Sequence, residues 1–126
     1  MSIGKNDQQR NETTDWRLNT RLVRGGTVRS QHGETSEALF MTSGYVYTCA
    51  EEAEARFRGT DDGYIYSRYG NPTVRMFEER MMLLEGAEDA RATASGMAAV
   101  NASLMCQLKA GDHVVAARAL FGSCLM

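Results

Sequence analysis

Apolar side chains between residues 72 and 85 recur every three or four positions, which is the spacing of a helix with one apolar face. Asn71 and Pro72 are typical of a helix start, and Gly86 is typical of the residue that follows a helix end. We therefore predict a helix that begins at Pro72 and ends before Gly86. The apolar positions that we expect to be buried are Val74, Phe77, Met81 and Leu84.

Beyond this helix, short apolar runs alternate with a second helical stretch. Strands are predicted over 90–94 and 113–117, a helix is predicted from Ser95 to about Lys109, and residues 120–123 resemble the turn into another helix. This alternation predicts an α/β fold in which helices cover a parallel sheet. Because two strands cannot form a stable sheet of this kind, we expect the region to be the start of a larger domain.

The first part of the chain lacks this alternation. We expect residues 1–71 to form an N-terminal arm that contacts a neighbouring subunit, and residues 72–126 to begin the larger domain. Residues 1–13 are polar and are expected to be disordered. Residues 25–47 are rich in Gly, Ser and Thr and predict an irregular extended segment. Such a segment buries little against itself, so it should pack on another surface.

Two short helices are predicted within this arm. For the first, Asp15 is the expected N-cap and Gly25 the expected end. The second is predicted to end at Gly59 and to begin at a capping box. In this box the Thr48 side chain accepts from the Glu51 amide, and the Glu51 side chain accepts from the Thr48 amide.

Charge and cysteine content narrow the possible functions. The 126 residues carry a net charge of −2, and their 14 basic residues are scattered, so we expect neither a nucleic-acid partner nor a membrane partner. The three cysteines are far apart and show no metal-ligand spacing, which indicates reduced thiols in the cytoplasm and no metal site. The sequence shows no secretory signal and no apolar stretch long enough to cross a bilayer.

The turn Ser95-Gly96-Met97 is a candidate phosphate site. Ligands of open α/β sheets bind beyond the carboxyl ends of the strands, where the first amides of the next helix are unpaired. The helix dipole favours an anion at this point, and Gly96 lets the backbone come close to it. Taken alone, however, the tripeptide is more typical of an ordinary helix start without a ligand.

Two other positions could contact the same kind of ligand. In the loop before Asn71, Arg68 can bind phosphate through two parallel hydrogen bonds and Tyr66 can donate its hydroxyl. Phe121, which follows the second predicted strand, could stack on a planar ring. Taken singly, these residues are more commonly an exposed arginine, aromatic rings that pack on the following helix, and a buried phenylalanine that covers the sheet edge.

Together and in order, these segments resemble the Cys/Met-metabolism (trans-sulfuration) family of pyridoxal-phosphate (PLP) enzymes. Residues 66–73 (Tyr-Ser-Arg-Tyr-Gly-Asn-Pro-Thr) resemble the family signature YSRxGNPT, and residues 95–99 resemble its phosphate-binding turn. Residues 34–40 and 50–53 resemble its N-terminal arm, and the whole resemblance covers about 15–125. It implies the large PLP-binding domain of a fold-type I enzyme, which is an aspartate aminotransferase-like α/β fold.

The resemblance also implies roles for single residues. The amides of Gly96 and Met97 would bind the cofactor phosphate, Phe121 would stack on the pyridine ring, and Tyr66 and Arg68 would reach the phosphate of a neighbouring subunit's cofactor. Most relatives have tyrosine at the position of Phe121, so the stacking is kept here but any role of a phenolic hydroxyl is excluded. Members of the family are usually homotetramers.

One functional group of the family has no counterpart in this sequence. Family members hold PLP through a lysine that also moves protons. The lysines here are Lys5 and Lys109, and neither lies in the family's lysine motif. We therefore assign no catalytic residue to these 126 residues, expect them to be inactive alone, and expect the lysine later in a longer protein.

The stretch Leu-Phe-Gly-Ser-Cys at 120–124 resembles the sulfhydrylase branch that uses O-succinylhomoserine. The expected reaction of the complete protein, within methionine biosynthesis, converts O-succinylhomoserine and sulfide to homocysteine and succinate. Within the family, the alternatives are cystathionine γ-synthase, cystathionine β-lyase and methionine γ-lyase. Outside it, an inactive shortened product could act only in subunit association, and an unrelated α/β phosphate-binding module would make the match at 66–73 accidental.

Overall fold

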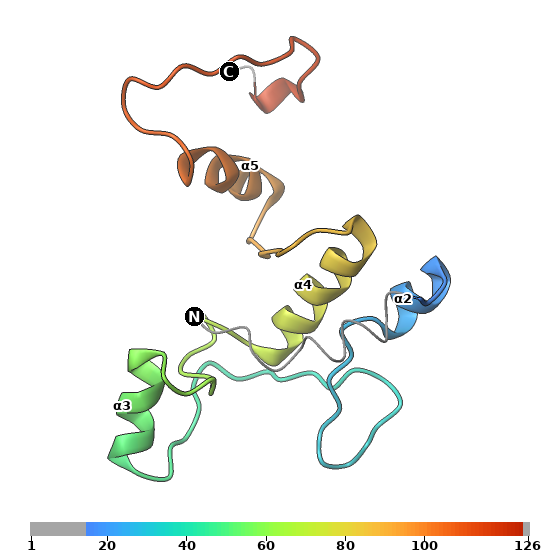
Figure 1. Cartoon of the computed structure of the whole chain (residues 1–126), viewed down its shortest axis with the longest axis vertical. Helices are drawn as coiled ribbons and strands as arrows, with labels where there is room; N and C mark the ends of the chain where they lie inside the picture. Colours follow the sequence, from blue (N-terminus) through green and yellow to red (C-terminus); the bar gives the residue numbers. More distant parts are fainter. Residues whose placement is uncertain (1–14, 125–126) are drawn as a thin grey trace. The chain divides into compact units, whose positions relative to one another are not determined.

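The computed structural model describes residues 15–124 and contains four α-helices and a short 3-10 helix within that range (Figure 1). The chain divides into two compact units, the first ending at Ala92 and the second starting at Thr93. The helices are α2 (Leu18–Arg24), α3 (Ala50–Arg58), α4 (Pro72–Glu85), α5 (Gly96–Met105) and the 3-10 helix η1 (Gly122–Cys124).

Helices α2 and α4 lie side by side in the first unit (Figure 1). The Arg21 guanidinium of α2 donates to the Trp16 carbonyl at 2.9 Å and to the Leu83 carbonyl of α4 at 3.5 Å. The predicted end at Gly25 is confirmed, but the predicted cap at Asp15 is wrong, because the N-cap residue is Arg17 and no side chain caps this helix.

Helix α3 begins at a capping arrangement that is shifted by one residue from the prediction. The N-cap residue is Cys49, and the Thr48 amide donates to the Glu52 carboxylate at 2.6 Å. The Thr48 hydroxyl donates to the same carboxylate, so the role predicted for Glu51 belongs to Glu52. The predicted end is confirmed, because Gly59 adopts a left-handed conformation with φ of 72°.

Helix α4 has the predicted ends. The Asn71 side chain accepts from the Thr73 amide, Pro72 occupies the first turn, and Gly86 ends the helix in a left-handed conformation.

The buried face of α4, in contrast, was wrongly predicted. Met76 and Met82 are buried, whereas Val74 and Phe77 are 42% and 55% exposed. The backbone at Gly26 comes against Met76 and Arg80, and Gly25 lies against Leu83, so the covered side of α4 differs from the predicted one. Periodicity identified the helix, but the arm that covers it determines which side is buried.

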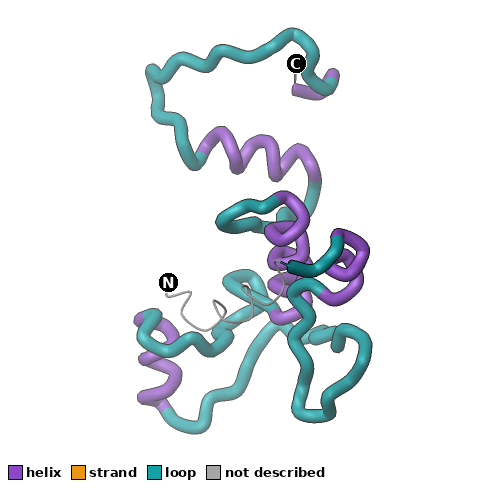
Figure 2. Tube along the Cα trace, turned by 45° about the vertical axis from the view of Figure 1, so that its right-hand side comes forward, coloured by secondary structure: helices purple, strands orange, loops and turns teal. Residues whose placement is uncertain are grey.

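The strands predicted over 90–94 and 113–117 are wrong for this structure. Figure 2 shows these segments as loop, and the only pairing of strand type within 15–124 is an isolated antiparallel bridge between Gly44 and Tyr66. An extended segment becomes a strand only when a neighbouring strand accepts and donates its backbone hydrogen bonds, and neither segment has such a neighbour in the described range. Residues 25–47 form the predicted irregular segment, with Gly44 as their one bridged residue.

The second unit consists of α5, an extended segment and η1. Helix α5 begins as predicted, with the Ser95 side chain accepting from the Ala98 amide. It ends at Met105 instead of near Lys109, because the Lys109 amide donates to the Asp112 carboxylate at 2.7 Å and the chain turns through Gly111 at φ of 98°. Helix η1 lies where the turn into another helix was predicted. No helix within 15–124 is long and apolar enough to cross a membrane.

Candidate functional site

The start of α5 presents unpaired backbone donors. The Ser95 hydroxyl accepts from the Ala98 amide at 3.1 Å, and the Ser95 carbonyl accepts from the Ala99 amide at 3.0 Å. Gly96 and Met97 precede these residues, so their amides have no acceptor inside the helix. A Cβ atom at Gly96 would meet no atom within 4 Å, so space is open for an anion to approach this backbone. The geometry fits the predicted phosphate turn.

Arg68 lies between two aromatic rings in the first unit. Its guanidinium carbon lies 5.5 Å from the ring centre of Tyr66 and 5.5 Å from that of Tyr69. The side chain is exposed, and no carboxylate in the described part of the chain pairs with it. The rings hold a cation in place without neutralising it, so Arg68 remains available to bind an anion.

The loop that carries Arg68 has a packed base. Tyr45 and Tyr64 stack with ring centres 5.3 Å apart and an interplanar angle of 25°. Burial, and then the neighbouring Tyr45, raise the pKa of Tyr64 above its ordinary value, so Tyr64 is a neutral packing residue. Arg56 adds a cation over the ring of Tyr47 at 5.3 Å and donates to the Tyr64 carbonyl at 3.1 Å.

Phe121 is 73% exposed and directly precedes η1. An exposed ring of this size has a free face that can stack on a planar group. The structure thus places Tyr66 and Arg68 together in the first unit, and Gly96, Met97 and Phe121 in the second.

No lysine of the described residues lies in these clusters. Lys109 is exposed in the turn after α5, and Lys5 lies outside the described residues. Among residues 15–124, no group of three His, Cys, Asp or Glu side chains could hold a metal ion.

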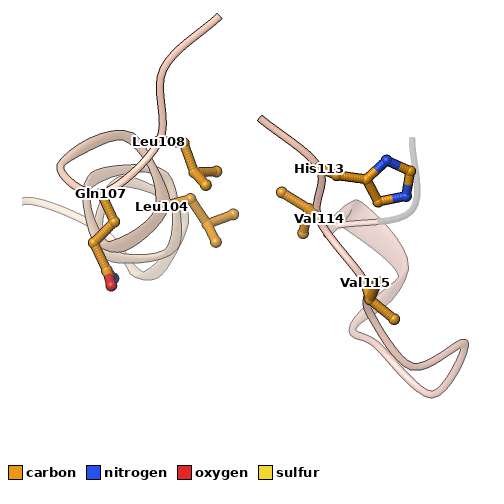
Figure 3. A pocket seen from close by; sticks show the side chains of 6 residues that line it. All are labelled: Leu104, Gln107, Leu108, His113, Val114 and Val115. Atoms are coloured by element: carbon orange, nitrogen blue, oxygen red, sulfur yellow. The ribbon is translucent and has the colours of Figure 1, made fainter. Parts of the chain in front are cut away.

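An open hollow of about 250 Å³ lies in the second unit between the end of α5 and the following extended segment (Figure 3). In this view Leu104 and Leu108 face Val114, while the His113 ring points away from α5. Its lining residues are Leu104, Gln107, Leu108, His113, Val114 and Val115. None of the predicted site residues contributes to it, and the facing apolar side chains are typical of an incompletely covered core.

Sequence reasoning missed two residues that organise the Arg68 loop. Asn71 was recognised only as a helix cap, but its side-chain nitrogen also donates to the Phe40 carbonyl at 2.9 Å and to the Ser67 hydroxyl at 3.1 Å. The available signal was the residue type. Asparagine has a side-chain NH₂ group in addition to its capping oxygen, and the other usual caps, serine, threonine and aspartate, have no such group. For Ser67, nothing in the sequence predicted the hydrogen bond between its amide and the Ser43 carbonyl.

Comparison with known proteins adds independent evidence. A model of the family described as Cys/Met metabolism PLP-dependent enzyme matches residues 19–126. The O-succinylhomoserine sulfhydrylase of Mycobacterium tuberculosis is 62% identical over 104 residues, covering 82% of this chain and 26% of the relative. An L-methionine gamma-lyase of Porphyromonas gingivalis is 40% identical over 103 residues, covering 82% of this chain and 26% of that relative.

A solved structure agrees with the same family. A putative O-acetylhomoserine (thiol)-lyase from Campylobacter jejuni, solved with N'-pyridoxyl-lysine-5'-monophosphate, superposes with a TM-score of 0.68 at 28% identity. The match covers 72% of this chain and 22% of that chain. The chain therefore spans about a quarter of the length of these relatives.

Proposed function

This chain belongs to the Cys/Met metabolism PLP-dependent enzyme family, and we propose that the complete protein is a sulfhydrylase converting O-succinylhomoserine and sulfide to homocysteine and succinate. The observation that carries this proposal is the 62% identity to an O-succinylhomoserine sulfhydrylase, against 40% to an L-methionine gamma-lyase over a stretch of similar length. Phe121, in a position where most relatives have tyrosine, supports the same branch.

In this proposal the residues of the chain bind and orient the cofactor. The amides of Gly96 and Met97 hold the phosphate, and Phe121 covers one face of the ring. Tyr66 and Arg68 complete the phosphate site of a neighbouring subunit. Bound PLP supplies an electron sink for removal of protons from the substrate. The lysine that moves these protons is expected outside the present 126 residues.

The subunit arrangement follows from the same reasoning. Residues 1–71 would act as an arm toward a neighbouring subunit, and 72–126 as the start of the PLP-binding domain, in a homotetramer. The exposed apolar side chains of Leu39, Met41 and Val46 in the arm support a protein surface as its partner. We also place the enzyme in the cytoplasm, on the basis of free Cys49, Cys106 and Cys124.

The proposal is tested on the purified complete protein that carries these residues. We expect release of succinate and formation of homocysteine from O-succinylhomoserine and sulfide, and Lys109→Ala should leave the activity unchanged, since the reacting lysine lies elsewhere. A complete protein that releases methanethiol from methionine but does not use O-succinylhomoserine would instead assign it to the methionine gamma-lyase branch, which the 40% identical relative represents.

The inactivity of the 126 residues alone is a separate prediction. The purified 126-residue chain should form no homocysteine even with PLP present, because it has no lysine in the family's position. Homocysteine formation by this chain would contradict the prediction.

A further inference from the structure

The side chain of Asn71 joins three parts of the first unit. It is 7% exposed, and its oxygen accepts from the Thr73 amide at 2.9 Å, which caps α4. Its nitrogen lies 2.9 Å from the Phe40 carbonyl, 3.1 Å from the Ser67 hydroxyl and 3.5 Å from the Thr42 carbonyl. A side-chain amide has two N–H groups, so the two short contacts use both donors.

Ser67 ties the neighbouring part of the loop to the same stretch of arm. Its amide donates to the Ser43 carbonyl at 2.9 Å, and its hydroxyl donates to the Thr42 carbonyl. Tyr66, one residue earlier, forms the antiparallel bridge with Gly44.

Thr73 adds a further connection at the start of α4, where its hydroxyl accepts from the Phe40 amide at 2.9 Å. Arm residues 40–44 are therefore hydrogen-bonded to the chain on both sides of Arg68.

Within residues 15–124, no hydrogen bond or ion pair holds the Arg68 side chain. Its side chain contacts the rings of Tyr66 and Tyr69, and it is exposed. The two rings and the backbone that carries them therefore orient Arg68, and the arm is hydrogen-bonded to this loop at Ser67 and Asn71. Immobilising a flexible side chain costs free energy when a ligand binds, and a support that fixes it beforehand reduces that cost.

From this geometry we infer that Asn71 and Ser67 are positioning residues for Arg68, and that arm residues 40–44 form part of the support of its phosphate site. This inference deepens the proposed function and depends on its assignment of Arg68 to the cofactor phosphate. It gives residues 40–44 a role in cofactor affinity at the neighbouring subunit's site, through hydrogen bonds made within their own subunit.

The test uses Asn71→Ser in the complete protein. Serine keeps an oxygen that can cap the Thr73 amide but removes the two N–H donors to the arm and to Ser67. Asn101→Ser is the matched control, because it makes the same chemical change at an exposed position of α5. Ser67→Ala is a second variant, which removes one hydroxyl and leaves the helix cap intact.

Two quantities are measured: the dissociation constant of PLP by equilibrium dialysis, and the hydrogen exchange rates of the Phe40 and Ser67 amides. We expect Asn71→Ser to raise the dissociation constant about tenfold, the effect of about one or two hydrogen bonds. In the same variant, the exchange rates of the Phe40 and Ser67 amides should both increase. Asn101→Ser should change neither the dissociation constant nor the exchange rates. In an Arg68→Ala background, Asn71→Ser should have no further effect on PLP binding, whereas a merely structural role would add to the loss.

The outcomes separate this inference from the proposed function. If Arg68→Ala weakens PLP binding but neither Asn71→Ser nor Ser67→Ala does, the positioning role is overturned and the proposed function stands. If Arg68→Ala leaves PLP binding unchanged, the phosphate role of Arg68 fails, and the positioning role fails with it.

Discussion

At the residue scale, a carboxylate in the arm is held by its own turn. Glu34 accepts from the Ser30 amide at 2.7 Å and from the Ser30 hydroxyl at 2.7 Å. These bonds, the amide first, lower the pKa of Glu34 from 4.5 to about 2. Because the folded pKa lies below the unfolded value, their contribution to stability is fully present above pH 4.5 and is lost as the pH falls toward 2.

Removing the Ser30 hydroxyl should therefore raise the pKa of Glu34. In Ser30→Ala we expect a pKa between about 2 and 4.5, because the amide bond remains. Carbon-13 NMR of the Glu34 carboxyl during a pH titration measures it. Ser36→Ala is the control and should leave the pKa unchanged; an unaltered pKa in Ser30→Ala would show that the turn does not hold the carboxylate.

Glu78 is a second carboxylate with a structural role. It is buried, and its carboxylate accepts from the Ala92 amide at 2.8 Å. Arg75 and Arg91 flank it at 3.6 and 3.8 Å. It thereby holds the segment that follows α4 against the helix.

Truncation of Glu78 should be costly for this reason. Glu78→Ala leaves the Ala92 amide without its acceptor, and we expect a loss of about 1–3 kcal/mol in the free energy of unfolding of the complete protein. Glu78→Gln keeps an acceptor oxygen and should lose less. Urea denaturation of both variants measures the difference, and equal losses would mean that charge, not the bond to Ala92, is what matters.

At the element scale, both ends of α4 were predictable and its buried face was not. The ends of α4 depend on Asn71, Pro72 and Gly86, whose conformational preferences act over a few residues. The local sequence could not decide whether 90–94 and 113–117 form strands, because a strand requires backbone hydrogen bonds to a neighbouring strand. The buried side of α4 was wrongly predicted for a similar reason, because it depends on contacts with the distant Gly25 and Gly26.

The end of α4 offers a direct test of this local control. Gly86 has φ of 64°, and a Cβ atom there would meet nothing within 4 Å, so Gly86→Ala should cost only backbone strain. We expect the free energy of unfolding to fall by about 1–2 kcal/mol. Gly44→Ala is the matched control, because its site is equally open and its φ is not positive. Equal effects of the two substitutions would contradict the strain explanation.

At the scale of the whole molecule, the described chain leaves much apolar surface uncovered. Met41 and Val115 are 95% and 91% exposed. Apolar side chains with so much accessible surface are normally covered by an interface or by the rest of a core. The family could be predicted because the segments containing Arg68 and Gly96 have specific local sequences. The hydrogen bonds of the arm around Arg68 could not, because the contacts of Asn71 and Ser67 with residues 40–43 join positions far apart in the sequence.

We accordingly expect the 126 residues alone to fold poorly. Differential scanning calorimetry should show no cooperative transition, and a dye that binds apolar surface should become fluorescent. The complete protein is the control and should show a cooperative transition with little dye binding. A cooperative transition of the isolated chain would contradict the expectation.

The bridge between Gly44 and Tyr66 has a consequence for variation in chain length. It brings together the two ends of the segment 45–65, which includes α3, so this segment is a closed loop. The entropic cost of closing a flexible loop grows only with the logarithm of its length. Insertions near Asp61 and Asp62, which are exposed, should therefore be tolerated with little displacement of Tyr66, which makes this loop a suitable place to add a tag or a reporter peptide.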